Sequence, residues 1–257
     1  MNTTVKPTII ILHGGWHVPE SYAKLIDALK PQGYEVHAPR LPSTNGTRPP
    51  NADLFTDSLL VRSYVESLVR AGRTVVTLMH SYGGHVGTNS LYGLGTDARQ
   101  AQGLRGGMSH LIYMTGYVVP EDVSMMDKAE EFGHTHLVPL VFDFTEDDTC
   151  LFRDPKGVMV GTGPDEKEIE EYLATFVRWN GKCMYQAGQH AAWREIPVSY
   201  IYTTLDSTVP LDYQKSFVEG LEKAGCKVQT FELATNHCPH FTATEGVVSV
   251  VNKVISG

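Results

Sequence analysis

The chain has 257 residues, of which 42% are hydrophobic and 19% charged, enough to bury a sizeable core within one domain. Its formal net charge of −8 argues against a nucleic-acid partner, and no apolar run reaches the roughly 18 residues that a membrane span needs. The four cysteines lack metal-site spacing, and the N-terminus lacks the pattern of a secretory signal, so we expect free thiols and a cytoplasmic protein.

Apolar runs of strand length alternate along the chain with amphipathic stretches of helix length. This alternation predicts an α/β protein with a doubly wound, mostly parallel sheet of about six strands. The predicted strands are 8–12, 34–38, 74–79, 111–114, 198–203 and 228–233. The predicted helices are 20–30, 54–71, 83–94, 212–224 and a C-terminal helix with apolar residues at helical spacing from Val247 to Ile255.

The segment 117–197, between the fourth and fifth strands, has a different texture. It is rich in Glu, Asp, Phe and Gly, and its one clear helical run is 166–178. Insertions at the carboxyl ends of strands in such a sheet overhang the ligand site. We therefore expect a single domain over 1–257, with 117–197 as a helical cap over an active site.

The most specific motif is His80-Ser81-Tyr82-Gly83-Gly84, between a predicted strand and a predicted helix. A serine hydroxyl becomes a good nucleophile only when it is held exposed, next to a base and near amide donors. A tight turn from strand to helix provides this, and the glycines let neighbouring backbone approach. The alternative is a serine in an ordinary turn.

This motif resembles the nucleophile elbow of the α/β-hydrolase family, with Met79 in place of the first glycine. The resemblance extends over nearly the whole chain and is closest to the compact branch of plant methylesterases and hydroxynitrile lyases. Few residues precede the first strand, so the leading hairpin of the family is expected to be absent. The resemblance implies that Ser81 is the nucleophile.

Three further motifs follow predicted strands, in the order that the resemblance requires. His13-Gly14-Gly15-Trp16 implies an oxyanion hole formed by the backbone amides of Gly15 and Tyr82, with His13 as a structural brace. Asp206, which is followed by Val209-Pro210, matches the family's acid; a helix N-cap is the alternative, which Asp212 fits better. His237, two residues before Pro239, matches the base, in preference to His240.

The cap is expected to supply part of the substrate pocket. Trp16, His190 and Trp193 are candidate substrate-binding residues, and Trp16 and His17 either line the pocket or pack beneath the cap. The cap carries more aromatic residues than a solvated insertion needs: Phe142, Phe144, Phe152, Trp179, Tyr185 and Trp193. These residues and the acidic character of the cap favour a neutral, partly hydrophobic substrate that is cyclic or aromatic.

The sequence also bears on a metal site and on other reactions. His134 and His136, near several carboxylates, form the one metal candidate, and their irregular spacing favours a solvated loop, so neither a metal nor another cofactor is expected. Similar hydroxynitrile lyases use a lysine just after the acid, where this chain has Ser207. A serine esterase or lactonase acting through an acyl-enzyme is therefore expected. A slow-turnover ligand sensor, or a carbon–carbon hydrolase or lyase using the same site, is the alternative, and the oligomeric state is open.

Overall fold

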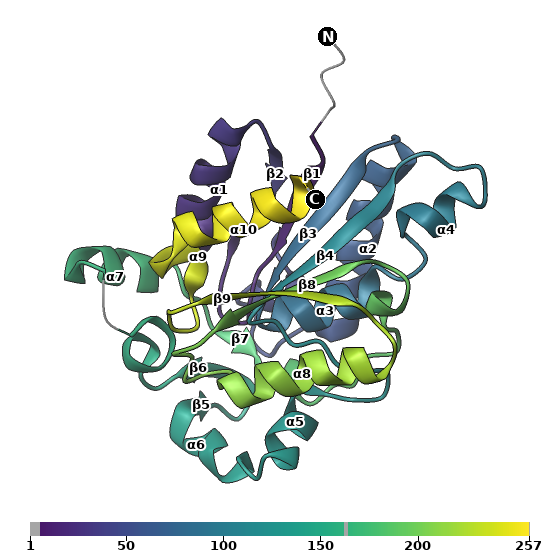
Figure 1. Cartoon of the computed structure of the whole chain (residues 1–257). Helices are drawn as coiled ribbons and strands as arrows, with labels where there is room; N and C mark the ends of the chain where they lie inside the picture. Colours follow the sequence, from purple (N-terminus) through teal and green to yellow (C-terminus); the bar gives the residue numbers. More distant parts are fainter. Residues whose placement is uncertain (1–5, 162–163, 257) are drawn as a thin grey trace.

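A six-stranded parallel sheet in the order β2-β1-β3-β4-β8-β9 forms the centre of the structure (Figure 1). The computed structural model of the chain describes residues 6–161 and 164–256. The strands are β1 (Thr8–Leu12), β2 (Glu35–His37), β3 (Thr74–His80), β4 (Gly107–Met114), β8 (Val198–Thr203) and β9 (Val228–Leu233). The predicted doubly wound sheet of six parallel strands is confirmed.

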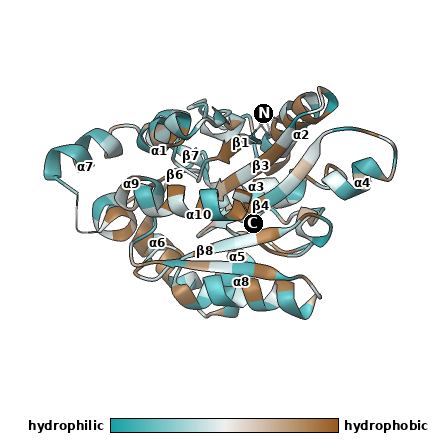
Figure 2. Cartoon of the chain, turned by 45° about the horizontal axis from the view of Figure 1, so that its top comes forward, coloured by the Kyte–Doolittle hydropathy of each residue, from teal (hydrophilic) through white to brown (hydrophobic). Residues whose placement is uncertain are grey.

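Helices cover both faces of the sheet because successive strand residues point in opposite directions. In β1, Ile9 and Ile11 pack in one core cluster with α1 and α10, whereas Ile10 and Leu12 pack in the other with α2, α3 and α8. Hydrophobic residues accordingly concentrate in the central strands (Figure 2). The helices outside segment 117–197 are α1 (Ala23–Leu29), α2 (Leu54–Arg70), α3 (Tyr82–Ser90), α4 (Thr96–Gln100), α8 (Leu211–Lys223), α9 (Pro239–Thr242) and α10 (Thr244–Ser256).

The segment 117–197 lies at the carboxyl ends of the strands, and it is not purely helical (Figure 1). Beside short helices it forms a three-stranded antiparallel sheet in the order β5-β6-β7, which the sequence pattern does not predict. Its elements are α5 (Met125–Glu131), α6 (Val138–Val141), β5 (Phe142–Phe144), β6 (Thr149–Phe152), α7 (Glu166–Leu173) and β7 (Trp179–Asn180). Within the described ranges, no helix is both long and apolar enough to cross a membrane.

Candidate active site

Ser81 lies in the tight turn between β3 and α3, with φ of 52° and ψ of −122°. A positive φ is costly for a residue with a side chain, and such strain concentrates at functional sites. Trp16 after β1 and Thr115 after β4 also have positive φ, so three strained residues follow three neighbouring strands. The turn places Ser81 in the wall of a cavity that is also lined by residues of segment 117–197, which is called the cap below.

The glycines after Ser81 are required by close backbone contacts. A β-carbon on Gly83 would come within 2.2 Å of the carbonyl oxygen of Leu12, and one on Gly84 within 2.7 Å of the carbonyl oxygen of Tyr117. Any side chain at these positions would push α3 away from β1 or from the start of the cap. The two glycines therefore fix the turn that presents Ser81.

Met79 occupies the position where the elbow motif has its first glycine, and the structure explains why it fits. The facing residue on α3 is Gly87, where an added β-carbon would lie 2.2 Å from the Met79 sulfur and 3.1 Å from a methyl group of Leu12. In the motif, a glycine on the strand leaves room for the helix. Here Gly87 on the helix leaves room for the Met79 side chain on the strand.

Gly87→Ala is therefore expected to lower the free energy of unfolding by about 1–3 kcal/mol, because the buried Met79 side chain must shift. Urea denaturation would measure this change. Gly220→Ala in α8 is the matched control: its β-carbon would meet no atom within 4 Å, so it should leave stability unchanged or raise it slightly. Equal effects at both positions would contradict this account of Met79.

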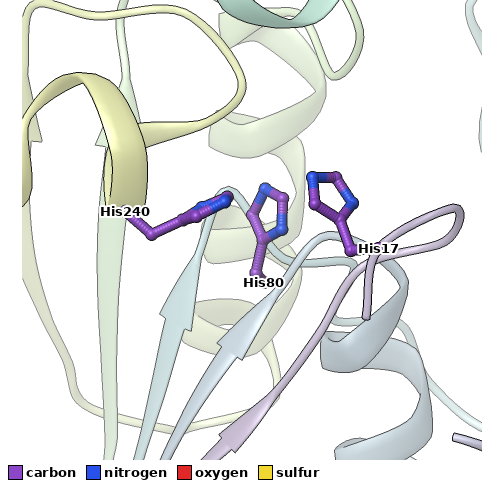
Figure 3. Close-up of side chains that lie close together, drawn as sticks. All are labelled: His17, His80 and His240. Carbon is purple, nitrogen blue, oxygen red and sulfur yellow. The ribbon is translucent and has the colours of Figure 1, made fainter. Parts of the chain in front are cut away.

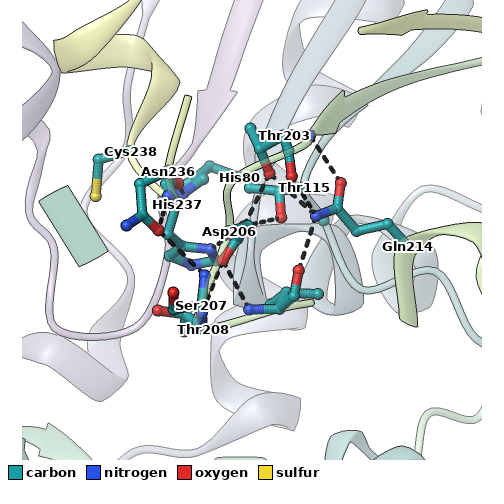
Figure 4. Close-up of polar contacts among 12 residues, drawn as sticks. His80, Thr115, Thr203, Asp206, Ser207, Thr208, Gln214, Asn236, His237 and Cys238 are labelled. Carbon is teal, nitrogen blue, oxygen red and sulfur yellow. Dashed lines mark hydrogen bonds and ion pairs between the residues drawn. The ribbon is translucent and has the colours of Figure 1, made fainter. Parts of the chain in front are cut away.

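Asp206, in the loop after β8, is a buried carboxylate with a full set of hydrogen bonds (Figure 4). Its Oδ2 accepts bonds from Thr115 Oγ1 at 2.7 Å, Thr203 Oγ1 at 2.8 Å and His237 Nδ1 at 2.8 Å, and its Oδ1 accepts 2.8 Å bonds from the amides of Thr208 and Val209. Burial alone would raise the pKa of this carboxyl, but the charge and hydrogen bond of His237 and the other donors hold it below its ordinary value. Asp206 is therefore ionised at neutral pH.

His237 follows β9 and is oriented by this carboxylate. Because a carboxylate only accepts, Nδ1 of His237 carries a hydrogen, and in the neutral ring the lone pair is therefore on Nε2. Nε2 is buried and has no hydrogen-bond partner among the described residues. The imidazole is thus held in the tautomer that a general base needs, with its basic nitrogen unengaged.

The loops carrying Ser81 and His237 are joined through His80. Nε2 of His80 donates to the carbonyl of His237 at 2.7 Å, while Nδ1 accepts from the hydroxyl of Tyr22 at 2.6 Å. That hydroxyl in turn accepts from the amide of Gly14 at 3.0 Å. One chain of hydrogen bonds therefore links the glycine loop after β1, the elbow and the histidine loop.

The two amides predicted to form the oxyanion hole, those of Gly15 and Tyr82, donate no hydrogen bond within the described part of the chain. His13 orients the first of them: its Nδ1 donates to the carbonyl of Gly14 at 2.9 Å, and its Nε2 accepts from the amide of Leu41. In a trans peptide the carbonyl and the next amide point in opposite directions, so fixing the Gly14 carbonyl fixes the Gly15 N–H. The expected role of His13 as a brace agrees with these contacts.

Three buried histidines, His17, His80 and His240, converge behind the site with ring nitrogens within 4.8 Å of one another (Figure 3). Their nitrogens already take part in hydrogen bonds, except Nδ1 of His240. Tyr172 from the cap contacts Nε2 of both His17 and His240 at 2.8 Å. A metal ion would have to break this network, and burial lowers the pKa of all three rings, which stay neutral. We interpret the cluster as a scaffold.

The cavity beside Ser81 has a volume of about 120 Å³ and a mostly apolar wall. Its apolar lining comes from the core and the cap: Trp16, Met125, Met126, Ala129, Leu137, Val138, Val141, Phe142, Met184, Val209 and Pro210. The polar lining residues are Ser81, Tyr117, His134, Ser207, Thr208 and Tyr213. Among the described residues, no Asp, Glu, Lys or Arg lines it.

Of the three candidate substrate-binding residues, the structure brings Trp16 alone to this cavity. Trp16 also packs beneath the cap, donating to the carbonyl of Cys150 at 2.9 Å. His190 instead stacks on Tyr92 at 3.6 Å, and Trp193 is buried with its indole N–H on the carbonyl of Val119. Neither residue lines the cavity beside Ser81, so their predicted contact with substrate stays a prediction.

Sequence reasoning missed Thr115, whose hydroxyl holds Asp206, and Tyr172, which joins the cap to the histidine cluster. Thr115 directly follows a predicted strand, so the rule that selected the other site residues could have found it. Nothing in the sequence around Tyr172 distinguishes it from a packing aromatic.

Comparisons with known proteins show the family of this chain. The model of the alpha/beta hydrolase family matches residues 9–250. A probable hydrolase of the fungus Phoma sp. is 26% identical over 252 residues, covering 97% of this chain and 98% of the relative. An alpha/beta hydrolase of Aspergillus novofumigatus is 28% identical over 211 residues, 80% of each chain.

Solved structures share the fold over nearly the full length. Polyneuridine aldehyde esterase superposes with a TM-score of 0.76 at 16% identity, covering 97% of this chain and 99% of that one. A methylesterase from Arabidopsis gives 0.74 at 14% identity, with the same coverage, and a pyrethroid hydrolase from Sphingobium faniae gives 0.73 at 19%, covering 98% of each chain.

Proposed function

The chain belongs to the alpha/beta hydrolase family, and from that premise we propose that it is a serine hydrolase that cleaves a small, neutral carboxylic ester or lactone. The observation that carries this proposal is the hydrogen-bonding pattern of His237. Its Nδ1–H is bound by buried Asp206, and its Nε2 has no partner among the described residues. The carbonyl of His237 is bound by His80, which directly precedes Ser81 in the strained turn. This arrangement suits proton abstraction from a serine hydroxyl.

In the proposed reaction, Ser81 Oγ attacks the ester carbonyl while His237 Nε2 takes its proton. The amides of Gly15 and Tyr82 stabilise the oxyanion, and the imidazolium of His237, stabilised by Asp206, then protonates the leaving alcohol. In the second half, His237 takes a proton from water, which attacks the acyl carbonyl. His237 then returns this proton to Ser81 Oγ as the bond from Ser81 to the acyl group breaks and the acid is released. The chain's own residues supply every proton transfer in this scheme.

The segment 117–197 acts in this proposal as the cap that shapes the substrate cavity. Met125, Val138 and Phe142 contribute apolar wall from this segment, opposite Val209 and Pro210 of the core. A carboxylate buried there would lose its hydration without gaining a cationic partner among the described lining residues, which is costly. The lining therefore supports a neutral substrate.

Matched esters with and without a second, ionised carboxylate test this proposal. We expect a kcat/KM at least tenfold higher for p-nitrophenyl butyrate than for the p-nitrophenyl monoester of succinate, because the second compound carries a buried charge. The release of p-nitrophenolate is the measurement, with Ser81→Ala as the control for background hydrolysis. A preference for the anionic ester would overturn the substrate class, and the absence of turnover on any neutral ester or lactone would overturn the proposed function.

A further inference from the structure

The wall of the cavity contains one polar pair that the proposed reaction does not use. His134, between α5 and α6 of the cap, and Tyr213, on α8 of the core, both line the cavity, and His134 Nδ1 lies 2.9 Å from the Tyr213 hydroxyl. Their rings are stacked with an interplanar angle of 11°, and Phe132 stacks on Tyr213 with ring centroids 4.4 Å apart. The pair is therefore held in position by aromatic contacts on both elements.

The pair keeps one free hydrogen-bond donor whichever of the two residues donates the bond between them. If Tyr213 donates to Nδ1, the hydrogen of His134 is on Nε2 and has no acceptor among the described residues. If Nδ1 donates to Tyr213, the phenolic hydrogen is the free one. Burial, and then the charge of Glu131, raise the pKa of Tyr213, so its hydroxyl stays protonated. One donor is thus available at neutral pH in both cases.

An unused donor in a mostly apolar wall is satisfied only by water or by a ligand. The neighbouring lining side chains Ala129, Leu137 and Val138 offer no acceptor. Thr208, a polar lining residue on the core side, already donates to the carbonyl of Val158 at 3.1 Å. The fitting ligand group is a neutral oxygen acceptor on an otherwise hydrophobic molecule.

We propose that His134 and Tyr213 form a recognition site for a second, uncharged oxygen of the substrate, so that the preferred substrates are hydrophobic esters carrying a ketone or hydroxyl group away from the cleaved bond. This inference rests on the proposed function, because it places the cleaved ester at Ser81. It assigns the pair a role in specificity and none in the chemical step.

The test compares p-nitrophenyl hexanoate with its 4-oxo and 5-oxo derivatives. For the wild-type protein, at least one oxo ester is expected to have a KM about three- to tenfold lower than the plain ester, the range that one hydrogen bond provides. Tyr213→Phe and His134→Phe, which keep an aromatic ring in place, should abolish this ratio, so that in each variant the oxo and plain esters have the same KM. Tyr185→Phe, on an exposed tyrosine of the cap, is the matched control and should preserve the ratio.

Binding to the Ser81→Ala protein separates this inference from the proposed function. Methyl 4-oxohexanoate and methyl 5-oxohexanoate, compared with methyl hexanoate by calorimetry, should give the same preference without turnover, and Tyr213→Phe should remove it. If the oxo and plain esters bind and react alike, or if Tyr213→Phe affects both equally, the pair is structural and the inference is overturned. If the preference in binding is present but the wild type hydrolyses no ester, the proposed function fails and the recognition site stands.

Discussion

Ser81→Ala and His237→Ala are each expected to lower kcat/KM for a neutral ester by about 10⁴- to 10⁶-fold, the loss typical of removing a member of a nucleophile–base unit. Ser81 supplies the attacking oxygen, and His237 is the one ring whose Nδ1 is fixed by Asp206. Because the two side chains act in one proton transfer, the double variant should be little slower than either single variant. Initial rates of p-nitrophenyl butyrate hydrolysis measure this, and labelling by a fluorophosphonate should be lost in Ser81→Ala.

His240→Ala is the matched control for the base. His240 is also fully buried, but it bonds to Tyr172 and stacks on Tyr22, with ring centroids 4.1 Å apart. The ring that bonds to Asp206 is that of His237. Its replacement should lower the melting temperature yet leave kcat/KM within about 10²-fold of wild type under conditions where the variant is folded. If His240→Ala were as inactive as His237→Ala, the assignment of the base would be wrong.

Acid is expected to unfold the protein before the pH reaches about 4. Burial lowers the pKa of His13 to about 4 and that of His17 to about 3, and it lowers those of His80 and His240 well below their ordinary value. Below pH 6.5 the unfolded chain therefore binds protons that the folded protein excludes, so stability is full above pH 6.5 and falls as the pH decreases. A shift of two pKa units corresponds to about 3 kcal/mol, and several such groups together approach the total stability of a domain.

Asp57 works in the opposite direction but is a single group. Burial raises the pKa of Asp57 to about 6, although hydrogen bonds from Ser43 and Tyr82 lower it. The folded protein therefore binds this proton more readily than the unfolded chain, and Asp57 adds to the stability of the protein as the pH falls from about 6 to 4. Urea denaturation between pH 8 and 4 would give the net slope. His240→Asn should reduce the slope of the free energy of unfolding against pH by the equivalent of about one proton taken up on unfolding. His136→Asn, which replaces an exposed histidine, should leave this slope unchanged. Unchanged stability down to pH 4 would contradict the neutral histidine cluster.

The sheet and the order of the site residues could be predicted from the sequence because both depend on local patterns. Strands 8–12, 198–203 and 228–233 coincide with β1, β8 and β9. The first two are mainly apolar, the third alternates apolar and polar residues, and turn residues bound each of them. In a parallel sheet the residues after each strand meet at one edge, so Asp206 and His237 could be brought together without knowing the cap.

The cap could not be predicted in the same way because long-range pairing sets its structure. β5 and β6 are three and four residues long. β7 has two residues and pairs with β6, although α7 separates the two strands in the sequence. Segments this short carry no periodicity that distinguishes strand from loop. The same limit applies to His190 and Trp193, which do not line the cavity beside Ser81, since residue type alone does not tell which side of an insertion a side chain faces.

The contacts between the cap and the loop after β1 restrict how a substrate can enter. Trp179 lies where a β-carbon on Gly15 would be, the amide of Val177 donates to the carbonyl of Trp16 at 2.8 Å, and Tyr172 bonds to His17. Lifting the cap as one piece would therefore dismantle the loop that carries the Gly15 amide. Within the described residues, α5 and α6 take no part in these contacts, and displacing them would leave that loop in place. Engineering of substrate access should for this reason target residues 125–141, and deleting the whole cap should not yield a smaller working enzyme.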